Sequence, residues 1–563
     1  MIDFLNNINL IHKNWIPSEK WESELLENKE KDKILIKKYS PSQKERKYAK
    51  QYAKTIINIV DKLDQQSINK STDAMIAINT IFSLPTILAP FLGGISGYFI
   101  AKNNNVLKNQ KKLSAFNGAM IGSGIYFIIS QFIRSQLEKE TTRIARFQSR
   151  KNELNNLSDF VVKIDKENES LIKNGFIPTS NEEVSSNLKA TKSYKNAFKT
   201  LKEMKEDYKE YSKWKKDFKA KEQATKKILQ KKIFTQEDLA NAQKDRNKII
   251  NTIYKLELAA NNEEINFQFA LDLIQYAAKM SGAIIATLLC LTIPKTLTKI
   301  NSQSNFIKNS KLLIPFTIPV ISLYLAAVLA KFQKDSAKLG RYETKKELIS
   351  NEESFITFDD FEKNNVHVKK VFLEKQGFIT RIINDIKSIK TMPKRLNNMY
   401  SDYKNSENKI LKKDIDLTSE QKRNAELLQK QLFYSYEKID EKSEGFTDDM
   451  DVLLNTTKIS IGTIVNVGFN IYSINLLTKK LKNFNRQKIP GFFEGLKLMK
   501  NLGRKDMINI FIVPYIIKST LCIILDTLSA TCRKKTNKIG IMTAINDLKD
   551  ERVYTPEYLN NVM

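Results

Sequence analysis

The chain has 563 residues and a formal net charge of +30, from 93 lysine and arginine residues against 63 acidic ones. A chain of this length is too long for one hydrophobic core and is expected to divide into several units. Only two histidines and three scattered cysteines are present, which argues against a disulfide framework, a zinc site or histidine-based acid–base catalysis. The sequence therefore predicts no catalytic residue, no metal ligand and no cofactor.

Composition varies strongly along the chain. The mean hydropathy of -0.39 is mildly polar, yet the apolar residues gather in six blocks and the remainder is strongly polar. The positive charge would suit anionic lipid head groups or a phosphate backbone. Lysine, asparagine and isoleucine dominate at the expense of arginine, alanine and glycine, so we attribute most of the charge to codon bias and solvated helix faces.

The sequence repeats itself three times. The copies open with similar runs at residues 34–38, 228–232 and 410–413. Each run is followed by a hydroxyl residue near an acid or an amide, a helical stretch, two apolar segments and a basic helix. In the first copy, Ser40 is predicted to cap the helix and Pro41 to occupy its first position.

This pattern predicts an all-α, multi-pass helical membrane protein. Three internal repeats of a two-helix transmembrane hairpin are flanked by soluble, partly coiled-coil-like helices. The predicted organisation is a polar segment at 1–33, repeat 1 at 34–160, a basic helical arm at 161–227, repeat 2 at 228–358, a second arm at 359–409 and repeat 3 at 410–563.

Six apolar segments are predicted to be spans. They are 74–101 and 113–133 in repeat 1, 271–294 and 312–330 in repeat 2, and 459–478 and 507–531 in repeat 3. A bilayer core about 30 Å thick needs about 20 apolar residues in a helix, and four of the segments are uncharged over that length. The segments 271–294 and 507–531 contain charges and are assigned because each completes the hairpin of its repeat. The alternative is that the hairpins form the buried core of a soluble helical protein. Soluble helices carry polar residues at every turn of their exposed face, and the segment 74–101 does not, which argues against this alternative.

Two pairs of glycines lie in the first hairpin, Gly93 with Gly97 and Gly118 with Gly122. Four-residue spacing puts both glycines of a pair on one helix face, where the missing side chains let two backbones approach closely. We expect these glycines to pack the hairpin rather than to form a dimer interface.

Polar residues within the predicted spans are the candidate functional residues. They are Lys518, Asp526, Asp272, Lys279, Asn466 and Asn470. The first two are eight residues apart and the next two are seven apart, so each pair can share a helix face. We favour pairing and packing roles, with snorkelling near a membrane edge, over an ion path.

A short basic motif follows each hairpin, at 143–147, 338–342 and 538–542. Its apolar spacing favours packing against the preceding helix of its own repeat. Between repeats, residues 189–232 hold sixteen lysines and six acids, with Leu201, Met204, Tyr208, Tyr211 and Phe218 forming one apolar stripe. The stripe predicts packing on a partner helix. Nucleic-acid binding by such a basic, aromatic helix is not favoured, because no known binding module is present.

No phosphate loop, dinucleotide fingerprint, zinc-protease motif or serine-hydrolase motif is present, so no enzymatic activity is predicted. The leading hypothesis is an integral membrane protein of structural or interaction type, whose partners are the lipid bilayer and a protein or second copy bound through the arms. One alternative is a channel or secondary transporter built from three pseudo-equivalent hairpins. Another is a basic peripheral helical protein that binds a membrane surface or nucleic acid. We expect a location in the cell (inner) membrane, with both termini cytoplasmic.

Overall fold

The computed structural model describes residues 2–104, 108–153, 190–230, 232–297, 418–480 and 513–563, with short stretches and single positions between 336 and 402. Within these residues the chain is helical apart from turns and short connections, and it contains no strand. The predicted all-α class is therefore confirmed for the described part. The predicted span 312–330 lies outside the described residues.

Three long helices begin at equivalent points of the three repeats: α3 (Gln43–Asn103), α7 (Gln236–Leu297) and α11 (Ser419–Lys480). Each start is capped by a hydroxyl oxygen that accepts a hydrogen bond from the backbone N–H three residues later. The pairs are Ser42–Glu45 at 3.3 Å, Thr235–Asp238 at 3.1 Å and Thr418–Gln421 at 3.3 Å. Equivalent positions of the three repeats can therefore be compared by counting residues from Ser42, Thr235 and Thr418.

The predicted helix start at Ser40 is wrong by two residues. Ser40 instead ends α2 (Pro17–Tyr39), where its φ of 40° lies in the left-handed region. The cap is Ser42, because Glu45 lies three residues further on and its carboxylate accepts a hydrogen bond from the Ser42 N–H at 2.8 Å. Ser42 and Glu45 together form a reciprocal capping box.

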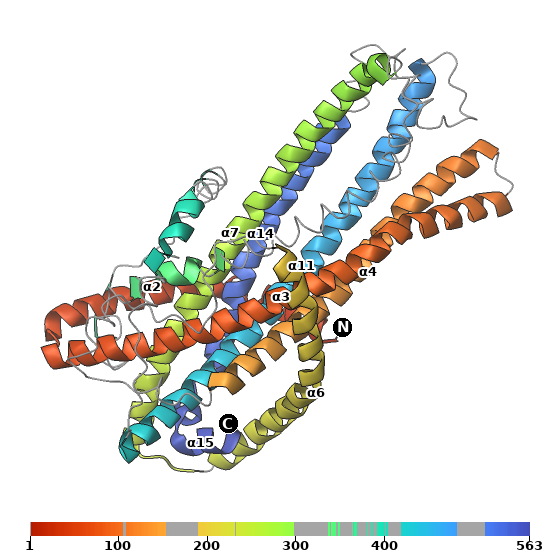
Figure 1. The fold of residues 1–563 in the computed structure, drawn as a ribbon. Helices are drawn as coiled ribbons and strands as arrows, with labels where there is room; N and C mark the ends of the chain where they lie inside the picture. The colour runs from red at the N-terminus through yellow and green to blue at the C-terminus, as the bar shows by residue number, and fades with distance from the viewer. Residues whose placement is uncertain are drawn as a thin grey trace.

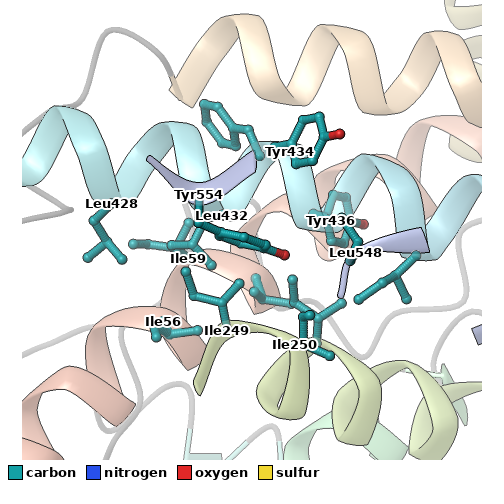
Figure 2. Close-up of a cluster of buried hydrophobic side chains, with 14 of the residues drawn as sticks. Ile56, Ile59, Ile249, Ile250, Leu428, Leu432, Tyr434, Tyr436, Leu548 and Tyr554 are labelled. Atoms are coloured by element: carbon teal, nitrogen blue, oxygen red, sulfur yellow. The ribbon is translucent and has the colours of Figure 1, made fainter. Parts of the chain in front are cut away.

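The three long helices meet in one apolar core (Figure 2). Ile56, Ile249 and Leu432 each stand 14 residues after the cap of their repeat, and all three are almost completely buried there. Three further equivalent sets belong to the same core, namely Ile57, Ile250 and Phe433, then Val60, Ile253 and Tyr436, then Leu63, Leu256 and Ile439. Because equivalent residues of all three repeats converge, the core has the arrangement expected around a pseudo-threefold axis.

From this core the long helices run toward the hairpins, and α4 (Lys108–Glu153) and α14 (Val513–Asp547) return from them. The far ends of these helices project toward the same end of the molecule in Figure 1. Helix α6 (Ala190–Leu229) lies toward the other end and packs across α3 and α4. We use "base" for the apolar core together with α6 and the C-terminal helices.

The chain returns to the base after α14, through η4 (Glu551–Tyr554) and α15 (Pro556–Val562). Tyr554 and Tyr558 are buried in the apolar core. The hydroxyl groups of Tyr558 and Tyr434 lie 3.0 Å apart, and Tyr434 also donates to Glu222 of α6 at 3.0 Å. Tyr434 of α11 thus connects to both α6 and α15 through buried hydrogen bonds.

The predicted spans fall on the long helices. Residues 74–101 belong to α3, 113–133 to α4, 271–294 to α7, 459–478 to α11 and 513–531 to α14. None of the helices, as far as the structure describes them, combines the length and the apolarity needed to cross a membrane.

Candidate functional site: buried ionic contacts between the repeats

A buried ionic cluster lies one residue beyond the apolar core along the long helices. Arg146 of α4 forms ion pairs with Asp440 and Glu444 of α11. Arg341, in the motif after the second hairpin, pairs with Glu257 of α7 at 3.4 Å. We call Arg146, Arg341, Glu257 and Asp440 the axial cluster; the side chain of each is at most 5% exposed.

The axial cluster follows the repeat. Glu257 and Asp440 each stand 22 residues after the cap of their helix, and the two arginines occupy the same position of the basic motif. Burial raises the pKa of the Asp440 carboxyl, and the Arg146 guanidinium opposes that rise. Removing one partner of such a pair leaves an uncompensated buried charge, at a cost of about 3–5 kcal/mol. The Arg146–Asp440 pair therefore fixes how repeats 1 and 3 are aligned, and the Arg341–Glu257 pair fixes two segments of repeat 2.

A second charged contact centres on Glu441, the residue after Asp440. Glu441 lies 3.3 Å from the Lys215 ammonium of α6 and 3.9 Å from the Arg143 guanidinium of α4. Burial alone would raise the pKa of Glu441, but Lys215 and Arg143 outweigh it and lower that pKa to about 2. This carboxylate connects three helices in its charged form.

Two further contacts lie closer to the hairpins. The Lys139 ammonium of α4 forms a buried ion pair with Asp449 of α11, and Asn7 of α1 (Ile2–Lys13) donates to the same carboxylate at 2.7 Å. On the other side, Lys534 of α14 donates to the Asn266 side-chain oxygen of α7. These contacts join helices of different repeats immediately below the predicted spans.

Among the candidate residues predicted from sequence, only Asp526 has a described side chain. Asp526 is buried and forms an ion pair with Lys458 of α11. Sequence reasoning missed this lysine, because it lies one residue before the predicted span 459–478. The side chains of Lys518, Asp272, Lys279, Asn466 and Asn470 lie outside the described residues.

The structure brings the predicted glycines together at the contact between α3 and α4. A Cβ atom on Gly93 would overlap the carbonyl oxygen of Gly118 and lie 3.0 Å from the Gly122 Cα atom. A Cβ atom on Gly97 would lie 3.1 Å from the Gly118 Cα atom. The Ser114 hydroxyl also donates to the Gly97 carbonyl at 2.7 Å. Only glycine allows the two backbones this approach.

Sequence reasoning also missed the acidic members of the axial cluster. The signal was present, because an acid follows Lys-Leu or Lys-Ile at the same place in each repeat, as Asp64, Glu257 and Asp440. No group of histidine, cysteine and carboxylate side chains in the described part of the chain could hold a metal ion. Positive and negative charges in the axial cluster compensate each other, an arrangement suited to holding helices together. Comparison with known protein families, curated proteins and solved structures found nothing similar to this chain.

Proposed function

We propose that this chain is an integral membrane protein of structural or interaction type. Its three hairpins enter the bilayer, and the base carries the contacts between repeats outside it. The base lies on the cytoplasmic side of the cell (inner) membrane in this proposal. No catalysis is assigned.

The observation that supports lipid contact is a stripe of isoleucines on α4. Ile121, Ile125, Ile129 and Ile133 recur every four residues and are between 45% and 54% exposed. Soluble helices carry polar side chains on an exposed face. An exposed apolar stripe of this length needs an apolar environment, which a bilayer would supply.

Two other hairpin helices, α3 and α14, have the same character where their side chains are described. Large apolar side chains are exposed on α3 and α14 within the predicted spans, at Leu92, Ile95, Phe99, Ile100, Val513, Ile516, Ile517, Ile524 and Leu528. Among the described residues of the spans, the buried Asp526 carboxylate is compensated by Lys458. Such compensation supports a structural role in preference to transport.

The test replaces two isoleucines of the α4 stripe, as Ile125→Lys with Ile129→Lys. Each lysine near the middle of a spanning helix opposes insertion by about 3 kcal/mol, so we expect a large loss of membrane-integrated protein. The measurement is flotation of membranes on a sucrose gradient after an alkaline carbonate wash, because aggregates sediment whereas membranes float.

The matched control is Ile228→Lys with Ile233→Lys in the base, where the side chains are 64% and 94% exposed. This variant should float like the unmodified protein. Release of the unmodified protein by carbonate would contradict the proposal. So would equal behaviour of the two double variants.

A further inference from the structure

The helical arms pack on the repeats at equivalent places. In repeat 1, Asp207 of α6 accepts a hydrogen bond from the Gln148 side chain of α4. The Lys70 ammonium of α3 is attracted electrostatically to the same carboxylate and to Glu203 of α6. Lys70 stands 28 residues after its cap, and Gln148 stands three residues after Ala145, the centre of the basic motif. An acidic side chain of the arm is therefore engaged by both elements of repeat 1.

Repeat 2 engages its own arm at the same two positions. Arg395 belongs to the second arm, which is helical at 391–399. Its guanidinium donates to Glu263 of α7 at 2.8 Å and to Glu343 at 2.7 Å. Glu263 stands 28 residues after its cap, and Glu343 stands three residues after Gly340, the centre of the second motif. The contact of repeat 1 is thus repeated with the charges reversed.

In repeat 3 the equivalent place is apolar and is covered by α1. Phe446 of α11 stands 28 residues after its cap, and Ile539 of α14 stands one residue before the centre of the third motif. Both belong to one apolar cluster with Ile11 of α1, which is only 1% exposed. The residue equivalent to Ile539 in repeat 1, Ile144, belongs to the apolar cluster that α6 covers.

The three places differ in the side chain that they can accept. An acid suits the lysine and amide of repeat 1 and would be repelled by the two carboxylates of repeat 2. The arginine of the second arm suits those carboxylates and would be repelled by Lys70. A charged side chain set against Phe446 and Ile539 would lose its hydration without gaining a partner. Each place therefore favours one arm and opposes the other two.

We propose that each repeat is a helix-binding module and that the residue 28 positions after its cap selects the helix. Lys70 selects the acidic part of α6, Glu263 selects the arginine of the second arm, and Phe446 selects the apolar face of α1. The ligand of each module is an amphipathic helix of matching character. This inference concerns the base and holds whether or not the hairpins enter lipid.

The first test gives repeat 2 the specificity of repeat 1 in the full-length protein. Arg395→Asp places an acid against two carboxylates and should lower the Tm by about 2–4 °C. Adding Glu263→Lys and Glu343→Gln supplies the lysine and amide found in repeat 1. The triple variant should therefore recover most of the loss.

The matched control is Lys394→Asp, which makes the same change of charge at the neighbouring, exposed position. Adding Glu263→Lys and Glu343→Gln to this variant should lower its Tm further, because Arg395 then faces a lysine. A triple variant no more stable than Arg395→Asp alone would overturn the proposal. So would equal recovery in the Lys394→Asp chain.

The second test supplies α1 as a separate peptide and does not depend on the charge variants. The full-length chain carries Ile11→Asp, which weakens the contact of its own α1. A fluorescent peptide of residues 1–16 should bind this chain. It should bind the unmodified chain about tenfold more weakly or less, because α1 already covers its place there. Fluorescence anisotropy in one detergent measures both affinities.

The control chain combines Ile11→Asp with Phe446→Lys and is measured with the same peptide in the same detergent. A lysine against the apolar face of α1 should weaken binding by about tenfold or more. Equal affinity with and without Phe446→Lys would contradict selection by this position. Absence of binding to the Ile11→Asp chain would contradict the proposed module.

Discussion

At the scale of single residues, the base depends on charges that are buried with their partners. Glu441 shows how neighbours decide the state of a carboxyl group. Burial opposes its charge, yet Lys215 and Arg143 lower its pKa from an ordinary 4.5 to about 2. Because the folded pKa lies below the unfolded one, the pair stabilises the protein fully above pH 4.5, and the stabilisation is lost as the pH falls toward 2.

Glu441→Gln is expected to lower the free energy of unfolding at pH 7 by about 2 kcal/mol, since it removes this charged contact. The difference from the unmodified protein should shrink between pH 4.5 and 2. Chemical unfolding over that pH range measures it. Glu426→Gln, at an exposed position of the same helix, should change little; a Glu441→Gln effect independent of pH would contradict the assignment.

At the scale of helices, close packing and helix propensity act in opposite directions at different glycines. Gly118 faces the backbone of Gly93 and Gly97, whereas no atom of the described residues lies within 4 Å of a Cβ atom on Gly468 of α11. Alanine at an open helical position gains about 1 kcal/mol over glycine. At a closed position the same methyl group forces the helices apart, at a cost of about 1–3 kcal/mol.

Gly118→Ala should therefore lower the Tm, and Gly468→Ala should leave it unchanged or raise it. The two substitutions add the same atoms to predicted spans, so each is the control for the other. Thermal unfolding of the purified protein measures both. A fall of similar size in both variants would show that the contact between α3 and α4 does not depend on Gly118.

The basic arm shows what a helical pattern can and cannot predict. Three members of its predicted apolar stripe, Met204, Tyr211 and Phe218, are buried. Tyr208, assigned to the same stripe, is 47% exposed, because α6 passes over α4 and does not follow one partner along its length. The Trp214 ring instead stacks on Arg150, with 3.7 Å between the guanidinium and the ring centre. Periodicity identifies a face but not the angle at which another helix crosses it.

At the scale of the whole molecule, the repeats were visible in the sequence but their order in space was not. Equivalent isoleucines and capping residues follow directly from local patterns, since each repeat must form the same helix. The position of repeat 3 beside repeat 1 depends on which surfaces fit, as when Lys139 pairs with Asp449 across 310 positions of sequence. No local signal contains that choice.

The base also depends on a segment outside the three long helices. Tyr558 of α15 is buried beside Tyr434 and shares a hydrogen bond with it. Tyr558→Phe should lower the free energy of unfolding by about 1 kcal/mol through the lost hydrogen bond. Tyr558→Ala should lower it by about 3–5 kcal/mol, because a cavity forms in the core. Denaturant unfolding measures both, and Tyr208→Ala, at an exposed position, is the control; equal effects of the alanine variants would contradict the role of α15.

The apolar core contains both Ile56 and Tyr554, so it can be completed only when nearly the whole chain has been synthesised. Ribosomes add about 5–20 residues per second, so roughly 25–100 s separate the emergence of these two side chains. During that interval the first hairpin exists without its eventual neighbours. The glycine contact between α3 and α4 involves only residues of the first repeat. These two helices can therefore pack together before the last repeat has been translated.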